Sequence, residues 1–254
     1  MTDVPVFFMP CHKQNTGSGD CKEKEIMKDK NVVLIGGSSG IGAALKIKLE
    51  NAGAIVYDYS RSATGDRKLD VMAEFKEIVG LPEQIDGLVY CPGSINLKPF
   101  HRFEVDEFRQ DFEVNVMGAI KVLQACMKQL KNSKSASVVL FSTVAVQVGL
   151  GFHASISSAK GAVEGLTRSL AAEWASSGIR VNAIAPSLTN TPLASQLLSS
   201  EEKVEASGKR HPLGRIGTSE ELAAAAYYLL SEDSSWMTGQ ILHLDGGLSA
   251  IKSM

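Results

Sequence analysis

The stretch Val32-Val-Leu-Ile-Gly-Gly-Ser-Ser-Gly-Ile-Gly42 is the most informative part of the sequence. Its first four residues form a continuous apolar run, which is typical of a strand buried on both faces of a parallel sheet. Glycines follow the run at once, and apolar residues then recur at helical spacing at Ile41, Leu45 and Leu49. The stretch therefore predicts a buried strand, a glycine-rich turn and a helix in succession.

The same alternation continues along the chain. Further strands are predicted at 54–59, 87–90, 137–141, 180–184 and 240–244, and further helices at 71–79, 105–130, 153–176 and 220–229. Alternating strands and helices imply right-handed crossovers, so the fold class is α/β. We expect a single doubly wound Rossmann domain, with a parallel sheet of about seven strands and helices on both faces. Residues 1–28 lack either periodicity and are interpreted as an N-terminal tail, and residues 29–254 as the domain.

Composition excludes several classes of protein. The 254 residues carry a net charge of -2 with both signs mixed along the chain, which argues against a nucleic-acid partner. No apolar run is long enough to span a membrane, and the N-terminus lacks a basic leader, so the cytoplasm is the expected compartment. No metal is predicted, because Cys11, His12 and Cys21 have no evident fourth ligand.

The glycine turn has the features of a phosphate-binding site. Gly36 permits the sharp bend, Gly40 permits close approach of a pyrophosphate, and Gly42 lets the helix pack against the sheet. The free N–H groups at the helix N-terminus favour negative charge there. The strand–turn–helix context therefore predicts that the turn holds a nicotinamide dinucleotide, with Ser38, Ser39 and Ile41 beside it.

The end of the second predicted strand bears on which dinucleotide is bound. An acid at this position binds the ribose 2′-hydroxyl of NAD, whereas an arginine accommodates the 2′-phosphate of NADP. Counting from Gly42, the position falls on Ser60, and Arg61 follows it. Asp58 lies two residues before Ser60 in an extended strand, too early to occupy the position of the NAD-binding acid. The pattern favours NADP(H).

The motifs together resemble the short-chain dehydrogenase/reductase family over residues 30–250. Besides the glycine motif, the matching segments are Asp70-Val71, Val114-Asn-Val-Met-Gly118, Asn182-Ala-Ile-Ala-Pro186 with Thr191, and Leu244-Asp-Gly-Gly247. Tyr90-Cys-Pro-Gly93 stands where the family has Asn-Asn-Ala-Gly, and Ser187 replaces the usual glycine. The resemblance implies that the cofactor is also held by Asp70, Val71, Cys91, Pro92, Gly93, Lys160, Pro186, Ser187, Leu188 and Thr191.

The resemblance also implies hydride transfer between a nicotinamide and a carbonyl or alcohol. Lys160 matches the family lysine, Asn115 the helix asparagine and Thr143 the serine that orients the substrate oxygen. The tyrosine that transfers the proton is replaced by Ile156, which has no proton to give. A general acid typically contributes about 10²- to 10⁴-fold in rate, so the usual route is missing.

His153 is a candidate to replace the tyrosine. It precedes Lys160 by seven residues, which on a helix offsets the two by only about 20°. Enoyl reductases of the same superfamily place their tyrosine at this spacing, although their glycine motif differs. The alternative interpretation is that His153 is a loop residue just before the helix.

Two further expectations concern the surroundings of the site. Residues 194–209 are expected to form a substrate lid, and Leu193, Leu197 and Leu198 hint at an apolar carbonyl or alcohol as substrate. The family is usually dimeric or tetrameric, so the resemblance implies a homodimer or homotetramer.

Two functions remain open from the sequence. The first is an NADP(H)-dependent oxidoreductase with a modified proton-transfer site, favoured by Lys160, Asn115 and Thr143. The second is a non-catalytic NADP(H)-binding protein, a sensor or structural partner, favoured by Ile156.

Overall fold

The computed structural model describes residues 27–252. The elements, in chain order, are β1 (Asn31–Ile35), α2 (Gly40–Asn51), β2 (Ile55–Tyr59), η1 (Gly65–Arg67), β3 (Gly87–Tyr90), η2 (Phe100–Arg102), α3 (Val105–Phe112), η3 (Glu113–Met117), α4 (Gly118–Asn132), β4 (Ser137–Phe141), η4 (Val144–Val146), α5 (Ala154–Trp174), η5 (Ala175–Ser177), β5 (Arg180–Pro186), β6 (Thr189–Asn190), η6 (Pro192–Leu198), α6 (Glu201–Gly208), β7 (Gly217–Thr218), α7 (Ser219–Leu230), η7 (Glu232–Ser234) and β8 (Ile241–Leu244).

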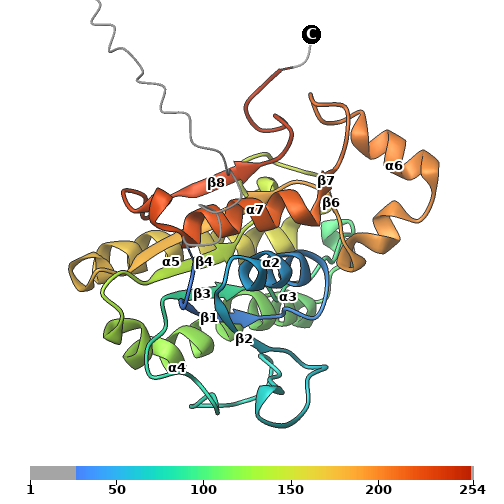
Figure 1. Cartoon of the computed structure of the whole chain (residues 1–254). Coiled ribbons are helices and arrows are strands. Elements are labelled where there is room, and N and C mark those ends of the chain that lie inside the picture. The colour runs from blue at the N-terminus through green and yellow to red at the C-terminus, as the bar shows by residue number, and fades with distance from the viewer. Residues whose placement is uncertain (1–26, 253–254) are drawn as a thin grey trace, which may run out of the picture.

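The main sheet is parallel throughout, with strand order β2-β1-β3-β4-β5-β8. Helices α2 and α7 cover one face, and α4 and α5 cover the other (Figure 1). The chain leaves β1 toward β2 on one side and later returns to place β3 on the other side. This reversal opens a crevice at the carboxyl ends of β1 and β3, the place where doubly wound sheets bind ligands.

Alternating residues of each strand supply the two halves of the core. In β1, Val33 and Ile35 pack with the apolar side chains of α4 and α5, whereas Val32 and Leu34 pack with those of α2 and α7. Burial on both faces explains the continuous apolar run seen in the sequence. Met27 is buried in the second half of the core, so the packed domain includes a residue that the sequence assigned to the tail.

The predicted α/β class, the doubly wound arrangement and the six strand positions named from the sequence are confirmed. The main sheet formed by residues 27–252 has six strands, where about seven were expected. A separate pair, β6 and β7, joins the segments on either side of the predicted lid. The lid itself contains η6 and α6, which stand away from the sheet at its edge (Figure 1).

The helix predicted at 71–79 is wrong, because the structure has only turns and bends there. Val71 and Ile78 are buried at helical spacing, which is the pattern that suggested a helix. The Ala73 carbonyl instead accepts a hydrogen bond from Lys121 Nζ at 3.0 Å, and the Asp70 carboxylate caps the Met72 N–H at 3.0 Å. Contacts with α4 and a local turn therefore replace helical hydrogen bonds.

The helix predicted at 105–130 exists, but a π-helical segment, η3, interrupts it between α3 and α4. The Tyr90 hydroxyl donates to the Val114 carbonyl at 2.6 Å, which diverts an acceptor from the helix ladder. Insertion of a side chain in this way is a known cause of such bulges, and they are frequent at functional sites.

In the described part of the chain, no helix is both long and apolar enough to cross a bilayer. Within the same residues, no three or more His, Cys, Asp or Glu side chains are grouped as a metal would require. The sequence candidates Cys11, His12 and Cys21 lie outside the described residues, as does most of the predicted tail.

Candidate active site: two adjoining cavities

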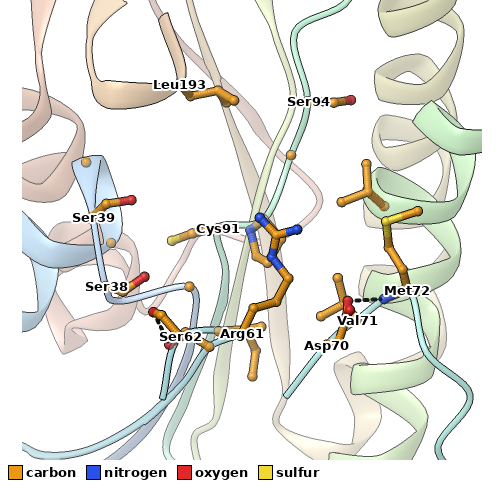
Figure 2. Close-up of a pocket in the computed structure, with 18 of the residues that line it drawn as sticks. Ser38, Ser39, Arg61, Ser62, Asp70, Val71, Met72, Cys91, Ser94 and Leu193 are labelled. Atoms are coloured by element: carbon orange, nitrogen blue, oxygen red, sulfur yellow. Dashed lines mark hydrogen bonds between the residues drawn. The ribbon is translucent and has the colours of Figure 1, made fainter. Parts of the chain in front are cut away.

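A cavity of about 660 Å³ lies in the crevice at the carboxyl ends of β1, β2 and β3. The glycine turn forms one wall, residues 70–72 form the opposite wall, and Arg61 lies between them (Figure 2). Most of the residues predicted to hold a cofactor line this single cavity, namely Gly36, Ser38, Ser39, Gly40, Ile41, Gly42, Ser60, Arg61, Asp70, Val71, Cys91, Pro92, Gly93 and Thr191.

The glycine turn is tight enough to need glycine at two of its positions. Gly36 has φ +89°, which L side chains rarely adopt. A Cβ at position 42 would lie 2.2 Å from the Gly36 carbonyl oxygen, so only glycine lets α2 start this close to β1. The result is an open helix N-terminus that faces the cavity, as anion binding requires.

Asp58 supports the glycine turn from β2. Its carboxylate accepts a hydrogen bond from the Gly37 N–H at 2.9 Å and forms an ion pair with Lys46 at 3.2 Å. Asp58 is not among the residues that line the cavity. Its two oxygens are therefore engaged by the protein rather than presented to a ribose.

Ser60 and Arg61 occupy the position at the end of β2 that faces the cavity. Figure 2 shows the Arg61 guanidinium reaching into it, between the glycine-turn serines and residues 70–72. Among residues 27–252, Arg61 has no ion-pair or hydrogen-bond partner. An unpaired guanidinium beside hydroxyl groups is suited to bind a phosphate.

A second, mostly apolar cavity of about 350 Å³ adjoins the first. The two share part of their walls, at Ile41, Cys91, Gly93, Ser94, Thr191 and Leu193. Of the remaining predicted residues, Thr143, His153, Lys160, Pro186, Ser187 and Leu188 line this second cavity. Of the three leucines suggested for substrate contact, Leu193 and Leu197 line it, whereas Leu198 borders a separate surface depression.

Lys160 is buried on α5 at the inner end of the second cavity. Its ammonium group donates to the Phe141 carbonyl at 2.8 Å. Burial lowers the pKa of Lys160 to about 8, because the charged form loses its hydration. A Cβ at position 93 would lie 3.5 Å from Lys160 Nζ and 3.1 Å from Asn115 Oδ1, so Gly93 keeps both polar groups uncovered.

Asn115 belongs to a buried network that the sequence did not predict. Its amide donates to Ser94 Oγ at 2.9 Å and to the Asp111 carbonyl at 2.8 Å. The Asp111 carboxylate accepts hydrogen bonds from Ser94 and Ser155, at 2.6 and 2.5 Å. Asn115 Oδ1 is buried without a partner, so it is free to accept a hydrogen bond from a bound group or a water.

The residue that replaces the family's tyrosine, the threonine expected to orient the substrate oxygen and the candidate histidine all line the second cavity. Ile156, 6% exposed, lies one helical turn before Lys160 and lines the same wall. Thr143 Oγ1 accepts from the Ala145 N–H at 3.3 Å and keeps its own hydrogen to donate. His153 immediately precedes α5, and its Nδ1 lies 2.6 Å from the Gly151 carbonyl oxygen, with the ring at the cavity wall.

The second cavity also contains two basic residues that the sequence had not assigned to the site. Arg210 and His211 follow α6 and line the cavity opposite α5. They lie in a stretch that the sequence placed only after the lid. No local pattern distinguishes them, because their place in the cavity depends on contacts with the loop after β8, where the Leu213 N–H donates to the Gly246 carbonyl at 3.1 Å.

Comparisons with known proteins agree with this geometry. Residues 63–249 match the family model described as enoyl-(acyl carrier protein) reductase. A tropinone reductase homolog of Arabidopsis thaliana is 34% identical over 248 residues, which cover 88% of this chain and 94% of that protein. The chain belongs to the short-chain dehydrogenase/reductase family.

Two other members of the family bear on the site. A protein of Xanthobacter autotrophicus named inactive 2-(S)-hydroxypropyl-CoM dehydrogenase 2 is 36% identical over 171 residues, covering 66% of this chain and 74% of that protein. A putative NAD(P)-dependent gluconate 5-dehydrogenase of Beutenbergia cavernae, solved with bound NADP at low occupancy, superposes with a TM-score of 0.81. It is 27% identical and covers 90% of this chain and all of its own.

Proposed function

We propose that this chain is an NADP(H)-dependent oxidoreductase that interconverts a carbonyl and an alcohol, with a modified proton-transfer site. The observation that carries the proposal is the joining of the two cavities. Arg61 lines the first cavity, Lys160 and Thr143 line the second, and the two cavities share a wall. One elongated ligand can therefore occupy the first cavity and present its end to a substrate in the second.

The first cavity fits a dinucleotide phosphate. The helix N-terminus of α2 would hold the pyrophosphate, and Ser60 and Arg61 would hold the 2′-phosphate. Asp70 and Val71 lie where an adenine would be bound, and Lys160, with the unpaired Asn115 Oδ1 near it, would hold the nicotinamide ribose. When bound, NADPH supplies the hydride for reduction of a carbonyl carbon.

The protein's own groups supply the rest of the chemistry. Thr143 would donate a hydrogen bond to the substrate oxygen, and the apolar walls would exclude water and select an apolar carbonyl or alcohol. His153, the candidate named from its spacing to Lys160, lies at the wall of the second cavity with its Nδ1 engaged by the Gly151 carbonyl, and His153→Gln tests whether it contributes to turnover.

A second candidate function is a non-catalytic NADP(H)-binding protein. It is favoured by Ile156, which replaces the hydroxyl of the family's tyrosine with an alkyl group. A 36% identical relative is itself named inactive. Lys160 is compatible with both functions, because a buried ammonium needs a partner and a bound ribose is one.

The deciding experiment uses the purified full chain. Titration with NADPH and NADH tests cofactor binding, and the loss of NADPH absorbance is then followed with a panel of cyclic ketones, aryl ketones and keto-thioesters. Binding with turnover supports the oxidoreductase, and binding without turnover of any probe supports the second candidate. Tighter binding of NADH than of NADPH would reject the assignment of Ser60 and Arg61.

We also infer that the chain forms a homodimer or homotetramer, as its family usually does. Light scattering on the eluting protein measures the mass of the assembly, and a monomer of 27.2 kDa would overturn this inference.

A further inference from the structure

Ser187 and His211 form a hydrogen-bonded pair in the wall of the second cavity. Ser187 Oγ lies 2.7 Å from His211 Nε2, and His211 Nδ1 lies 2.9 Å from the Ser207 carbonyl oxygen. A carbonyl oxygen can only accept a hydrogen bond, so Nδ1 carries a proton. In the neutral ring Nε2 is then an acceptor, and the Ser187 hydroxyl donates to it.

The protein packs tightly around His211, whereas Ser187 is half-buried. The His211 side chain is only 5% exposed, and Gly246 packs so closely that a Cβ there would lie 3.3 Å from His211 Cβ. Ser187 follows Pro186 at the end of β5, where its N–H donates to the Leu244 carbonyl at 3.2 Å. Both residues line the cavity that also contains Thr143 and Lys160.

The hydroxyl at position 187 is a departure from the family pattern, which has glycine there. It coincides with a second departure at Ile156, where a hydroxyl is lost from the same cavity. One proton-bearing group is therefore absent from α5, and another is present at the end of β5. His153 has no comparable hydroxyl partner, since the only hydrogen bond that its ring makes within residues 27–252 is to the Gly151 carbonyl.

No carboxylate among the described residues forms a hydrogen bond with the His211 ring. The other titratable groups that line the cavity are Cys91, His153, Lys160 and Arg210. The neighbouring loop carries Asp245, whose carboxylate is already bonded by Gly247 and Ser249. Among the described lining residues of the second cavity there is no carboxylate, so a carbonyl rather than an acid orients the ring.

We propose that Ser187 and His211 are the proton-exchange pair of this enzyme and take the place of the missing tyrosine hydroxyl. The inference rests on the oxidoreductase function proposed above. Ser187 would touch the substrate oxygen and is the catalytic residue. His211 acts through Ser187 and is a positioning residue that also stores the proton.

The proton balance differs between the two directions. In reduction the substrate carbon accepts the hydride, its oxygen takes the Ser187 hydroxyl proton, and Ser187 Oγ takes the Nε2 proton of the His211 imidazolium. Solvent then reprotonates His211. In oxidation the same transfers run in reverse, so the substrate hydroxyl loses its proton to Ser187 and neutral His211 receives the Ser187 proton. Reduction therefore requires protonated His211, and oxidation requires neutral His211.

The activity test compares Ser187→Gly, His211→Asn and His153→Gln with the unchanged chain, using NADPH and the ketone that it reduces fastest. His101→Asn, an exposed histidine that lines neither cavity, is the matched control. We expect Ser187→Gly and His211→Asn to lower kcat by about 10²-fold or more, while His101→Asn leaves kcat unchanged. We also expect His211→Asn to alter the pH profile of kcat/KM, which His101→Asn should leave unchanged.

A second readout does not depend on turnover. In ¹⁵N-histidine-labelled protein without cofactor, the resonances lost in His211→Asn identify this ring, and we expect its neutral form to carry the proton on Nδ1. Ser187→Gly should shift the Nε2 resonance.

Three results separate the possibilities. If the neutral His211 ring carries its proton on Nε2, the proposed hydrogen-bonded pair is overturned. If Ser187→Gly and His211→Asn keep the kcat and the pH profile of the unchanged chain, the proton-exchange role is overturned. Neither result affects the proposed oxidoreductase function. If the unchanged chain binds NADPH but reduces no probe, the proposed function fails and the proton-exchange role fails with it.

Discussion

The Asp58 carboxylate accepts a hydrogen bond from the Gly37 N–H at 2.9 Å and so ties the end of β2 to the glycine turn. The same carboxylate pairs with Lys46 in the middle of α2, which ties that helix to β2 as well. The acid near the end of β2 therefore supports the glycine turn in this chain, and we expect it to have no part in the choice between NAD and NADP.

Replacement of Asp58 by Ala should therefore weaken the binding of NADPH and the binding of NADH to the same extent. The change frees the Gly37 N–H and leaves Lys46 without its partner, at an expected cost of about 1–3 kcal/mol in the free energy of unfolding. Urea denaturation measures that cost, and titration with both cofactors measures binding. A changed ratio of the two affinities would mean that Asp58 contributes to cofactor choice after all.

Replacement of Arg61 by Ala should weaken the binding of NADPH and leave the binding of NADH nearly unchanged. A hydrogen bond to a charged group is worth about 1.5–3 kcal/mol, so the Kd for NADPH should rise roughly 10- to 100-fold while that for NADH changes little. Arg109→Ala is the matched control, because Arg109 is exposed, pairs with Asp106 and lines neither cavity. Equal losses for both cofactors would contradict the assignment of Arg61 to the 2′-phosphate.

The sequence could predict the glycine turn and the strands because their signals are local. A continuous apolar run is buried on both faces when it forms a central strand, and the glycines that follow it permit a tight turn. Val71, Phe75 and Ile78 gave an equally local helical signal, but contacts with α4 from another part of the chain replaced the helix. The hydrogen bonds that join Ser94, Asp111 and Ser155 connect three separate segments, and nothing local marks them in advance.

Replacement of Lys160 by Met should stabilise the free protein while impairing the proposed activity. Burial lowers the pKa of Lys160 to about 8 from 10.5, so between these values the unfolded chain binds a proton that the folded chain does not. The free energy of unfolding therefore rises as the pH rises from 8 to 10.5, and the cost of burying the charge is fully present below pH 8.

That cost is about 3 kcal/mol for a shift of this size, and part of it is offset by the hydrogen bond to the Phe141 carbonyl. We expect Lys160→Met to raise the free energy of unfolding by about 1–2 kcal/mol at pH 7, and the gain to shrink toward pH 10.5. Urea denaturation at the two pH values measures both, with Lys128→Met on the exposed face of α4 as control. A gain that does not depend on pH would argue against a buried charge as its cause.

Replacement of Ile156 by Tyr tests how much the missing hydroxyl costs. The side chain already lines the second cavity one turn before Lys160, so a phenol there would meet the substrate space. We expect Ile156→Tyr to raise kcat for ketone reduction by about 10²-fold in a chain that also carries Ser187→Gly, because the phenol then supplies the general acid that this variant lacks. Ile156→Phe supplies the ring without the hydroxyl and should show no rise. Turnover that appears only in Ile156→Tyr, with none in the unchanged chain, would favour the non-catalytic function.

The wall shared by the two cavities has a kinetic consequence. Cys91, Gly93 and Thr191 border both spaces, so an occupant of the first cavity completes the boundary of the second. A substrate that binds before the dinucleotide would enter a cavity that lacks part of its wall. A substrate that binds after the dinucleotide would cover part of the bound dinucleotide. We therefore expect an ordered mechanism in which the dinucleotide binds first and dissociates last. Dissociation of the dinucleotide would then limit kcat.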